Sequence, residues 1–108
     1  MIETKLDHKA FRNAVREHAE RALGSQLDVL VLYGSRARGD AHEESDWDVL
    51  AMLHDNADVA MARRDLLEIT GQLAERFGER VQFLAIRWAD THDAVGLIEN
   101  AAREGVRL

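Results

Sequence analysis

Two aspartates, Asp46 and Asp48, have the type and spacing to do chemistry. They lie two residues apart at the start of an apolar segment, residues 49–53. Because side chains alternate along a strand, both carboxylates are expected on one face, roughly 6–7 Å apart, with Trp47 packing on the other. Paired carboxylates suit one or two Mg²⁺ ions that bridge substrate phosphates. Taken alone, Asp-x-Asp at the start of a strand is more often a solvated turn.

A second feature, Gly34-Ser35, directly follows another apolar segment, residues 27–33. Glycine lets the backbone approach a ligand closely, and the amides and hydroxyl at the start of a following helix can form an anion cradle. Arg38 stands three residues beyond Ser35, on the same side of a helical turn, where its guanidinium could face phosphate oxygens. The glycine also fits a plain strand-to-helix turn, and on spacing alone Arg38 is equally a surface residue paired with a neighbouring acid.

The elements that must position these residues follow from the apolar pattern. Strands are predicted over residues 27–33, 46–53 and 81–86. Helices are predicted over residues 8–23, 36–38, about 56–77 and about 91–103. Ser35 is predicted to cap the second of these helices, and the last is predicted to bury Val95, Ile98 and Ala102. The order α-β-α-β-α-β-α with short connections predicts the α/β (α+β) class: a single mixed sheet flanked by helices, with residues 1–108 as one domain.

Composition narrows the function further. The net charge of −6 argues against a broad electrostatic grip on nucleic acid, so no direct nucleic-acid partner is expected. No apolar stretch is long enough to span a membrane, and residues 1–7 lack the features of a secretory signal, so a cytoplasmic location is expected. The absence of cysteine excludes disulfides, thiolate metal sites and a cysteine nucleophile.

Taken together, the segments GSRARGD at 34–40 and SDWDVL at 45–50 resemble the minimal nucleotidyltransferase (MNT) group of the DNA polymerase beta superfamily. This group occurs as antitoxins paired with HEPN ribonuclease toxins. The resemblance implies that Gly34 and Ser35 hold the distal phosphates of a nucleotide. It also implies that Asp46 and Asp48 bind the Mg²⁺ ions that polarise the alpha phosphate.

One position departs from the superfamily pattern. A third carboxylate usually comes from the later strand, and its natural place here is taken by Gln82. An amide can coordinate weakly through its carbonyl but cannot accept a proton as a carboxylate does. Glu79, just before that strand, would have to reach inward to substitute. The site is therefore expected to be slow, completed by a partner, or reduced to nucleotide binding.

The resulting hypothesis is a Mg²⁺-dependent nucleotidyltransferase that moves a nucleoside monophosphate, AMP from ATP, onto a hydroxyl of a partner protein, a HEPN toxin. A second hypothesis is a non-catalytic antitoxin that binds and occludes its toxin. A third is a transferase with a small-molecule acceptor, for which this chain offers no second domain, although a homo-oligomer could build a pocket.

Overall fold

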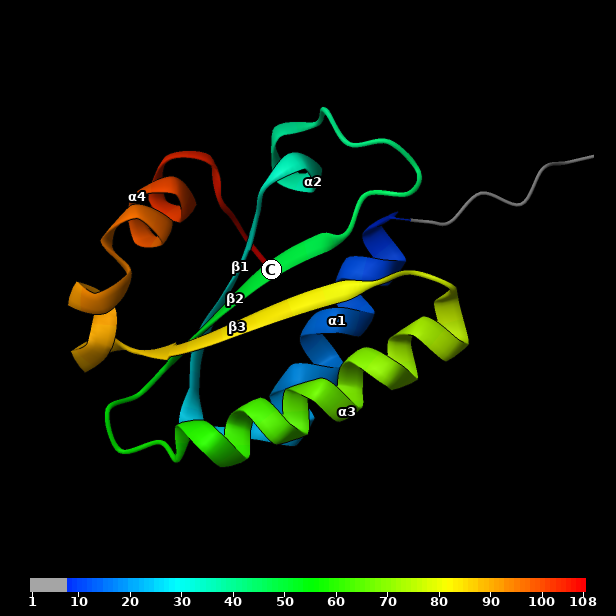
Figure 1. The fold of residues 1–108 in the computed structure, drawn as a ribbon. Coiled ribbons are helices and arrows are strands. Elements are labelled where there is room, and N and C mark those ends of the chain that lie inside the picture. Colours follow the sequence, from blue (N-terminus) through cyan, green and yellow to red (C-terminus); the bar gives the residue numbers. More distant parts are fainter. Residues whose placement is uncertain (1–7) are drawn as a thin grey trace, which may run out of the picture.

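A computed structural model of the chain describes residues 8–108, which form one four-stranded sheet with helices on both faces (Figure 1). The strands are β1 (Leu27–Tyr33), β2 (Trp47–Leu53), β3 (Val81–Arg87) and β4 (Val106–Arg107). The helices are α1 (His8–Leu23), α2 (Ser35–Arg38), α3 (Val59–Phe77) and α4 (Val95–Glu104), with 3-10 segments at Gly24–Gln26 and Trp88–Ala94. The expectation that residues 1–7 form no secretory signal lies outside this description.

The sheet is mixed, as predicted. Its strand order is β3-β2-β1-β4, with β1 antiparallel to both β2 and β4 and β2 parallel to β3 through the α3 crossover. β2 lies between β1 and β3, and residues 49–53 are all buried. This burial explains the continuous apolar run, because a strand covered on both faces has no polar side.

The two faces of the sheet are covered unequally. α1 and α3 pack on one face around Phe11, Trp47 and Leu73. α4 covers part of the opposite face, where Ala101 packs with Leu50 (Figure 1). None of the helices in residues 8–108 is long and apolar enough to cross a membrane.

The starts of β2 and α3 differ from the prediction. β2 begins at Trp47, so Asp46 lies just before the strand rather than in it. α3 begins at Val59 rather than near residue 56, because the Asp58 side chain accepts a hydrogen bond from the Met61 amide and caps the helix there.

The C-terminal region departs most from prediction. The chain runs through the 3-10 segment Trp88–Ala94 before α4 begins, and Val95 is 53% exposed rather than buried. The buried alanine is Ala101, not Ala102. The two-residue strand β4 was not predicted, since it is too short to show an alternating pattern.

Candidate active site

Gly34 and Asp48 are in direct contact at the end of β1. Tyr33 pairs with Asp48 across the β1–β2 ladder, which places the next residue, Gly34, beside that carboxylate. Gly34 has φ 76° and ψ −159°, a conformation that is essentially restricted to glycine. A Cβ at position 34 would lie 2.6 Å from Asp48 Oδ2. Both the backbone turn and the close approach of the carboxylate therefore require glycine.

The charge of Asp48 is poorly compensated. Burial, and then the neighbouring charge of Asp46, raise the pKa of Asp48 above its ordinary value, while Arg38 acts weakly in the opposite direction. Burial and the charge of Asp48 also raise the pKa of Tyr33. Both shifts show that additional positive charge would be favourable at this point.

Asp46 has one oxygen that lacks a hydrogen bond. Its Oδ1 is buried and is the one such side-chain atom in residues 8–108. Arg80 Nη2 forms an ion pair with it at 3.0 Å, and the arginine side chain is largely exposed. A buried carboxylate oxygen that has an ion pair with an exposed arginine but no hydrogen bond, next to a second carboxylate, fits a divalent cation. Asp46 and Asp48 are therefore the residues that would hold Mg²⁺.

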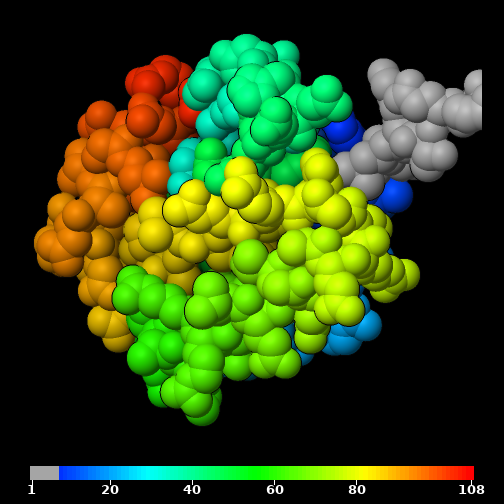
Figure 2. Space-filling view, turned by 45° about the vertical axis from the view of Figure 1, so that its right-hand side comes forward, coloured from blue at the N-terminus to red at the C-terminus, as the bar shows by residue number. Residues whose placement is uncertain are grey.

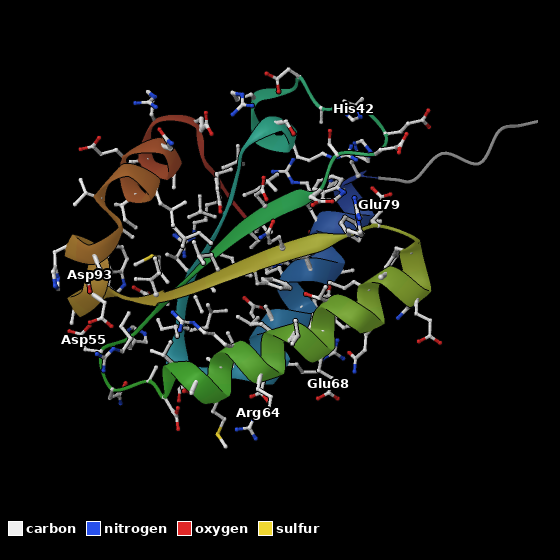
Figure 3. The ribbon with its side chains drawn as sticks, in the orientation of Figure 1. His42, Asp55, Arg64, Glu68, Glu79 and Asp93 are labelled. Carbon is white, nitrogen blue, oxygen red and sulfur yellow. The ribbon has the colours of Figure 1, made fainter. Side chains whose placement is uncertain are left out.

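The loop before β2 is held by Arg36. Its guanidinium donates to the carbonyl oxygens of Ser45 and Glu43, stacks 4.6 Å over Trp47, and lies 3.5 Å from Glu79. The buried Trp47 in turn donates from Nε1 to Glu79 at 2.8 Å. Glu79, labelled in Figure 3, is thus engaged with Trp47 on the face opposite Asp48 and does not serve as a third carboxylate.

Gln82 lies beside Asp48 on the adjacent parallel strand. The β2–β3 register pairs these two residues directly, and paired residues of neighbouring strands lie about 4.8 Å apart on the same face. Gln82 is exposed. Within the described residues, no group of three His, Cys, Asp or Glu side chains could hold a metal. The structure thus places an amide at the position where a third carboxylate was sought.

The predicted role of Ser35 as a helix cap was wrong. α2 begins at Ser35, the N-cap position is Gly34, and no side chain forms a capping hydrogen bond. The helix is only four residues long, so Ser35 occupies its first turn rather than the position before it. Its proposed contact with phosphate stays a prediction.

Arg38 is paired with two acids. Its Nε donates to Asp40 at 3.1 Å, and its Nη1 donates to Glu104 at 3.1 and 3.2 Å. These hydrogen bonds raise the pKa of Arg38. The side chain is 46% exposed, so it remains accessible to a ligand.

Glu104 is the site residue that sequence reasoning missed. It accepts a 3.1 Å hydrogen bond from the Gly34 amide as well as those from Arg38. The two residues are separated by 70 positions in the chain, and no local pattern signals their contact. Only the return of the chain from α4 to β4 brings them together.

A groove opens beside Asp46. It has a volume of about 550 Å³ and runs between α3 and β3. Asp46 and Gln82 line its end near the carboxylates, and Leu67 and Leu84 contribute exposed apolar side chains. Figure 2 shows this face, with the green α3 below the yellow β3. The groove offers room for part of a ligand next to Asp46.

This fold, with a glycine turn against Asp48, is that of a nucleotidyltransferase domain. The family described as "Polymerase beta, Nucleotidyltransferase" matches residues 16–108, and the chain belongs to that family. No curated protein matches the chain.

Similar solved structures include a minimal nucleotidyltransferase and toxin–antitoxin structures. A minimal nucleotidyltransferase superposes with a TM-score of 0.68 at 24% identity, covering 98% of this chain and 100% of the other. A toxin–antitoxin structure with AMP-PNP gives a TM-score of 0.62 at 24% identity, covering 94% and 72% of the two chains. The complex of a tri-AMPylated Shewanella oneidensis HEPN toxin with its MNT antitoxin gives 0.60 at 21% identity, covering 92% and 69%. At these identities the likeness shows the shared fold.

Proposed function

We propose that this chain is a Mg²⁺-dependent nucleotidyltransferase that moves AMP from ATP onto a hydroxyl of a partner protein, a HEPN toxin for which it acts as antitoxin. The contact between Asp48 and the Gly34 turn carries the proposal, because it joins a carboxylate pair to a backbone turn that can approach phosphates. The proposed partner and nucleotide are supported by the fold neighbours, which include a toxin–antitoxin structure with AMP-PNP and an AMPylated HEPN toxin with its antitoxin.

Each site residue has a proposed role. Gly34, Ser35 and Arg38 orient the distal phosphates of ATP through the turn, the hydroxyl and the guanidinium. Asp46 and Asp48 hold Mg²⁺, which when bound neutralises phosphate charge as it builds up during transfer. Positioning and charge neutralisation are the main contributions a protein makes to this reaction.

The reaction balances as an in-line displacement. The acceptor oxygen forms a bond to the alpha phosphorus, the bond from that phosphorus to the bridging oxygen breaks, and pyrophosphate leaves with the electron pair. The acceptor hydroxyl also loses a proton. Gln82 cannot take this proton as a base, so it leaves through solvent or through a group on the partner.

The position of Gln82 also favours a second candidate function. A transferase site without a third carboxylate could be kept only for nucleotide binding, with the chain neutralising a toxin by covering it. In that case the two aspartates would not be needed for neutralisation, which separates the two proposals. A small-molecule acceptor would use the same residues and would be detected by transfer in the absence of a protein partner.

The experiment is to incubate the chain with labelled ATP, Mg²⁺ and the protein encoded by the neighbouring gene, and to measure the partner's mass. We expect a gain of one or more AMP groups. Asp46→Asn or Asp48→Asn should lower the transfer rate at least about 100-fold, since even outer partners of metal ligands cost 10–100-fold. Both variants should keep the native circular dichroism spectrum.

Glu44→Gln is the matched control, because it removes one negative charge from the exposed loop before Asp46. Its transfer rate should match the parent. Toxin neutralisation without any mass gain, retained in Asp48→Asn, would contradict transfer and establish occlusion instead.

A further inference from the structure

The Glu104 carboxylate is bound by groups proposed to bind phosphate. Its Oε1 accepts from the Gly34 amide at 3.1 Å, and both of its oxygens lie within 3.2 Å of Arg38 Nη1. The side chain is 19% exposed, so it is inserted into the site rather than spread over the surface. A backbone amide and a guanidinium converging on one anionic group form the kind of donor set that binds a phosphate oxygen.

The fold delivers Glu104 to this position. It is the last residue of α4, and the next residue, Gly105, donates its amide to Ala101 O at 2.8 Å. A Cβ at Gly105 would lie 2.2 Å from that oxygen and 2.5 Å from Val31 Cγ1, so the tight reversal needs glycine. β4 then pairs with β1, where Val106 lies opposite Leu32.

Helix stability does not explain an acid at this place. The C-terminal end of a helix carries partial negative charge, and a carboxylate in the last turn of α4 is therefore unfavourable. Arg103, immediately before it, has the favourable sign. The contacts with Gly34 and Arg38 are what compensate the charge of Glu104.

We propose that the Glu104 carboxylate occupies the phosphate cradle, which is formed by the Gly34 amide and the Arg38 guanidinium. A polyphosphate must displace this carboxylate in order to bind. The residue thereby sets the affinity and selectivity of the site: weakly charged anions do not compete with it, whereas a polyphosphate does because it brings several charges and can engage Ser35 as well. This inference rests on the proposed function, since it assigns the Gly34 turn and Arg38 to phosphate binding.

The experiment measures binding of inorganic tripolyphosphate, without metal or nucleoside, to the whole chain by calorimetry. In Glu104→Gln the competing charge is removed while the side-chain length is retained. We expect the dissociation constant to fall about tenfold, because apparent affinity is reduced by the fraction of molecules in which the cradle is free. Glu99→Gln, an equal charge change at an exposed position of the same helix, should change it less than about twofold.

A second measurement needs no variant. In the parent chain, the amide resonance of Gly34 and the side-chain carboxyl resonance of Glu104 should shift together and saturably as tripolyphosphate is added. This readout keeps the test decisive if Glu104→Gln folds poorly. An unchanged Glu104 carboxyl resonance during saturable binding would overturn the proposal.

The remaining outcomes are also assigned. An unchanged dissociation constant in a folded Glu104→Gln overturns displacement, and a higher one shows that Glu104 instead positions Arg38 for the phosphate. Absence of tripolyphosphate binding to both chains overturns it as well. If the chain transfers AMP but Glu104→Gln does not change tripolyphosphate binding, this inference is wrong and the proposed function stands. If Glu104→Gln changes tripolyphosphate binding tenfold but the chain does not transfer AMP, this inference stands and the proposed function is wrong.

Discussion

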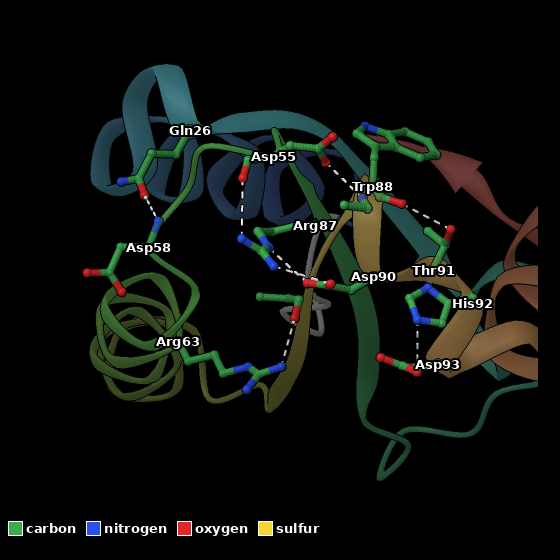
Figure 4. Close-up of polar contacts among 12 residues, drawn as sticks. Gln26, Asp55, Asp58, Arg63, Arg87, Trp88, Asp90, Thr91, His92 and Asp93 are labelled. Carbon is green, nitrogen blue, oxygen red and sulfur yellow. Dashed lines mark hydrogen bonds and ion pairs between the residues drawn. The ribbon is translucent and has the colours of Figure 1, made fainter.

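Both ends of the central strands carry aspartates, but the pKa of an aspartate is lowered at one end and raised at the other. At the far end, Arg87 donates to Asp90 through Nε at 2.8 Å and through Nη2 at 3.2 Å, and its Nη1 donates to the Asp55 carbonyl (Figure 4). Asp55 also accepts from the Ala89 amide at 2.8 Å. The hydrogen bond from Arg87 holds the pKa of Asp90 below its ordinary value. The charged groups of this end stabilise one another.

At the other end, the carboxylates are less fully compensated, although Arg80 lies 3.0 Å from Asp46. Asp48 has a raised pKa and Asp46 keeps a buried oxygen without a hydrogen bond. Figure 3 shows the separation, with Asp55 and Asp93 at one end of the sheet and Glu79 at the other. Arg87 donates two hydrogen bonds to Asp90, whereas Asp46 has only an ion pair with Arg80 and Asp48 has a raised pKa, so this end of the sheet is the candidate functional end.

The first way to sharpen this comparison is to add a third acid to the less compensated end. Gln82→Asp should raise AMP transfer about 100-fold or more, because a carboxylate beside Asp48 supplies a metal ligand and a proton acceptor, and acid–base assistance alone is typically 10²–10⁴-fold. The measurement is the single-turnover rate at saturating ATP and Mg²⁺. Gln72→Asp, on exposed α3 surface, is the control and should have no effect. An unchanged rate would show that the acceptor proton leaves by another route.

The second way is to force Asp48 away from its turn. Gly34→Ala combines a glycine-only conformation with a Cβ 2.6 Å from Asp48 Oδ2, so we expect a loss of about 1–3 kcal/mol in the free energy of unfolding measured in urea. Gly71→Ala is the control, since that glycine lies inside α3 with nothing near its Cβ, and it should gain about 0.5–1 kcal/mol. Equal stability of the parent and Gly34→Ala would show that the turn adapts.

Much of the fold could be predicted because it is encoded locally. The largely apolar run at residues 27–33 and the three- to four-residue apolar spacing of α3 each fit within one element. The same holds for Trp47, which is buried in the core with Phe11. Asp46 lies before β2, so the common face predicted for it and Asp48 stays a prediction. The turn at Gly34 could also be predicted, because a glycine directly after a strand indicates a special backbone conformation.

What could not be predicted depends on contacts distant in sequence. Glu104 reaches Gly34 only because the two residues of β4 pair with β1. The burial of Asp46 Oδ1 depends on the path of the chain before β2, which Arg36 fixes through the carbonyl oxygen of Ser45. The sequence offers the residues for such contacts, whereas the choice among them is made by tertiary packing.

A third prediction concerns the stability cost of the less compensated end. Because the pKa of Asp48 is higher in the folded than in the unfolded state, its charged form destabilises the folded protein at pH values above the folded pKa. Asp48→Asn should therefore raise the melting temperature by a few degrees at pH 7 without Mg²⁺. The advantage should shrink as the pH falls toward the ordinary value of 3.8, where the parent carboxylate becomes protonated. A lower melting temperature at pH 7 would mark Asp48 as a structural residue.

The smallest expected effect comes from the compensated end, and its sign is opposite. The pKa of Asp90 is lowered by Arg87, so the carboxylate contributes stability that is present above 3.8 and is lost as the pH falls through the lower folded value. Asp90→Asn should therefore lower the melting temperature slightly at pH 7 and leave it unchanged in strong acid. The side chain is 37% exposed, so water and salt screen the pair, and the difference should diminish at high ionic strength. A shift in the same direction as that of Asp48→Asn would remove the contrast between the two ends of the sheet.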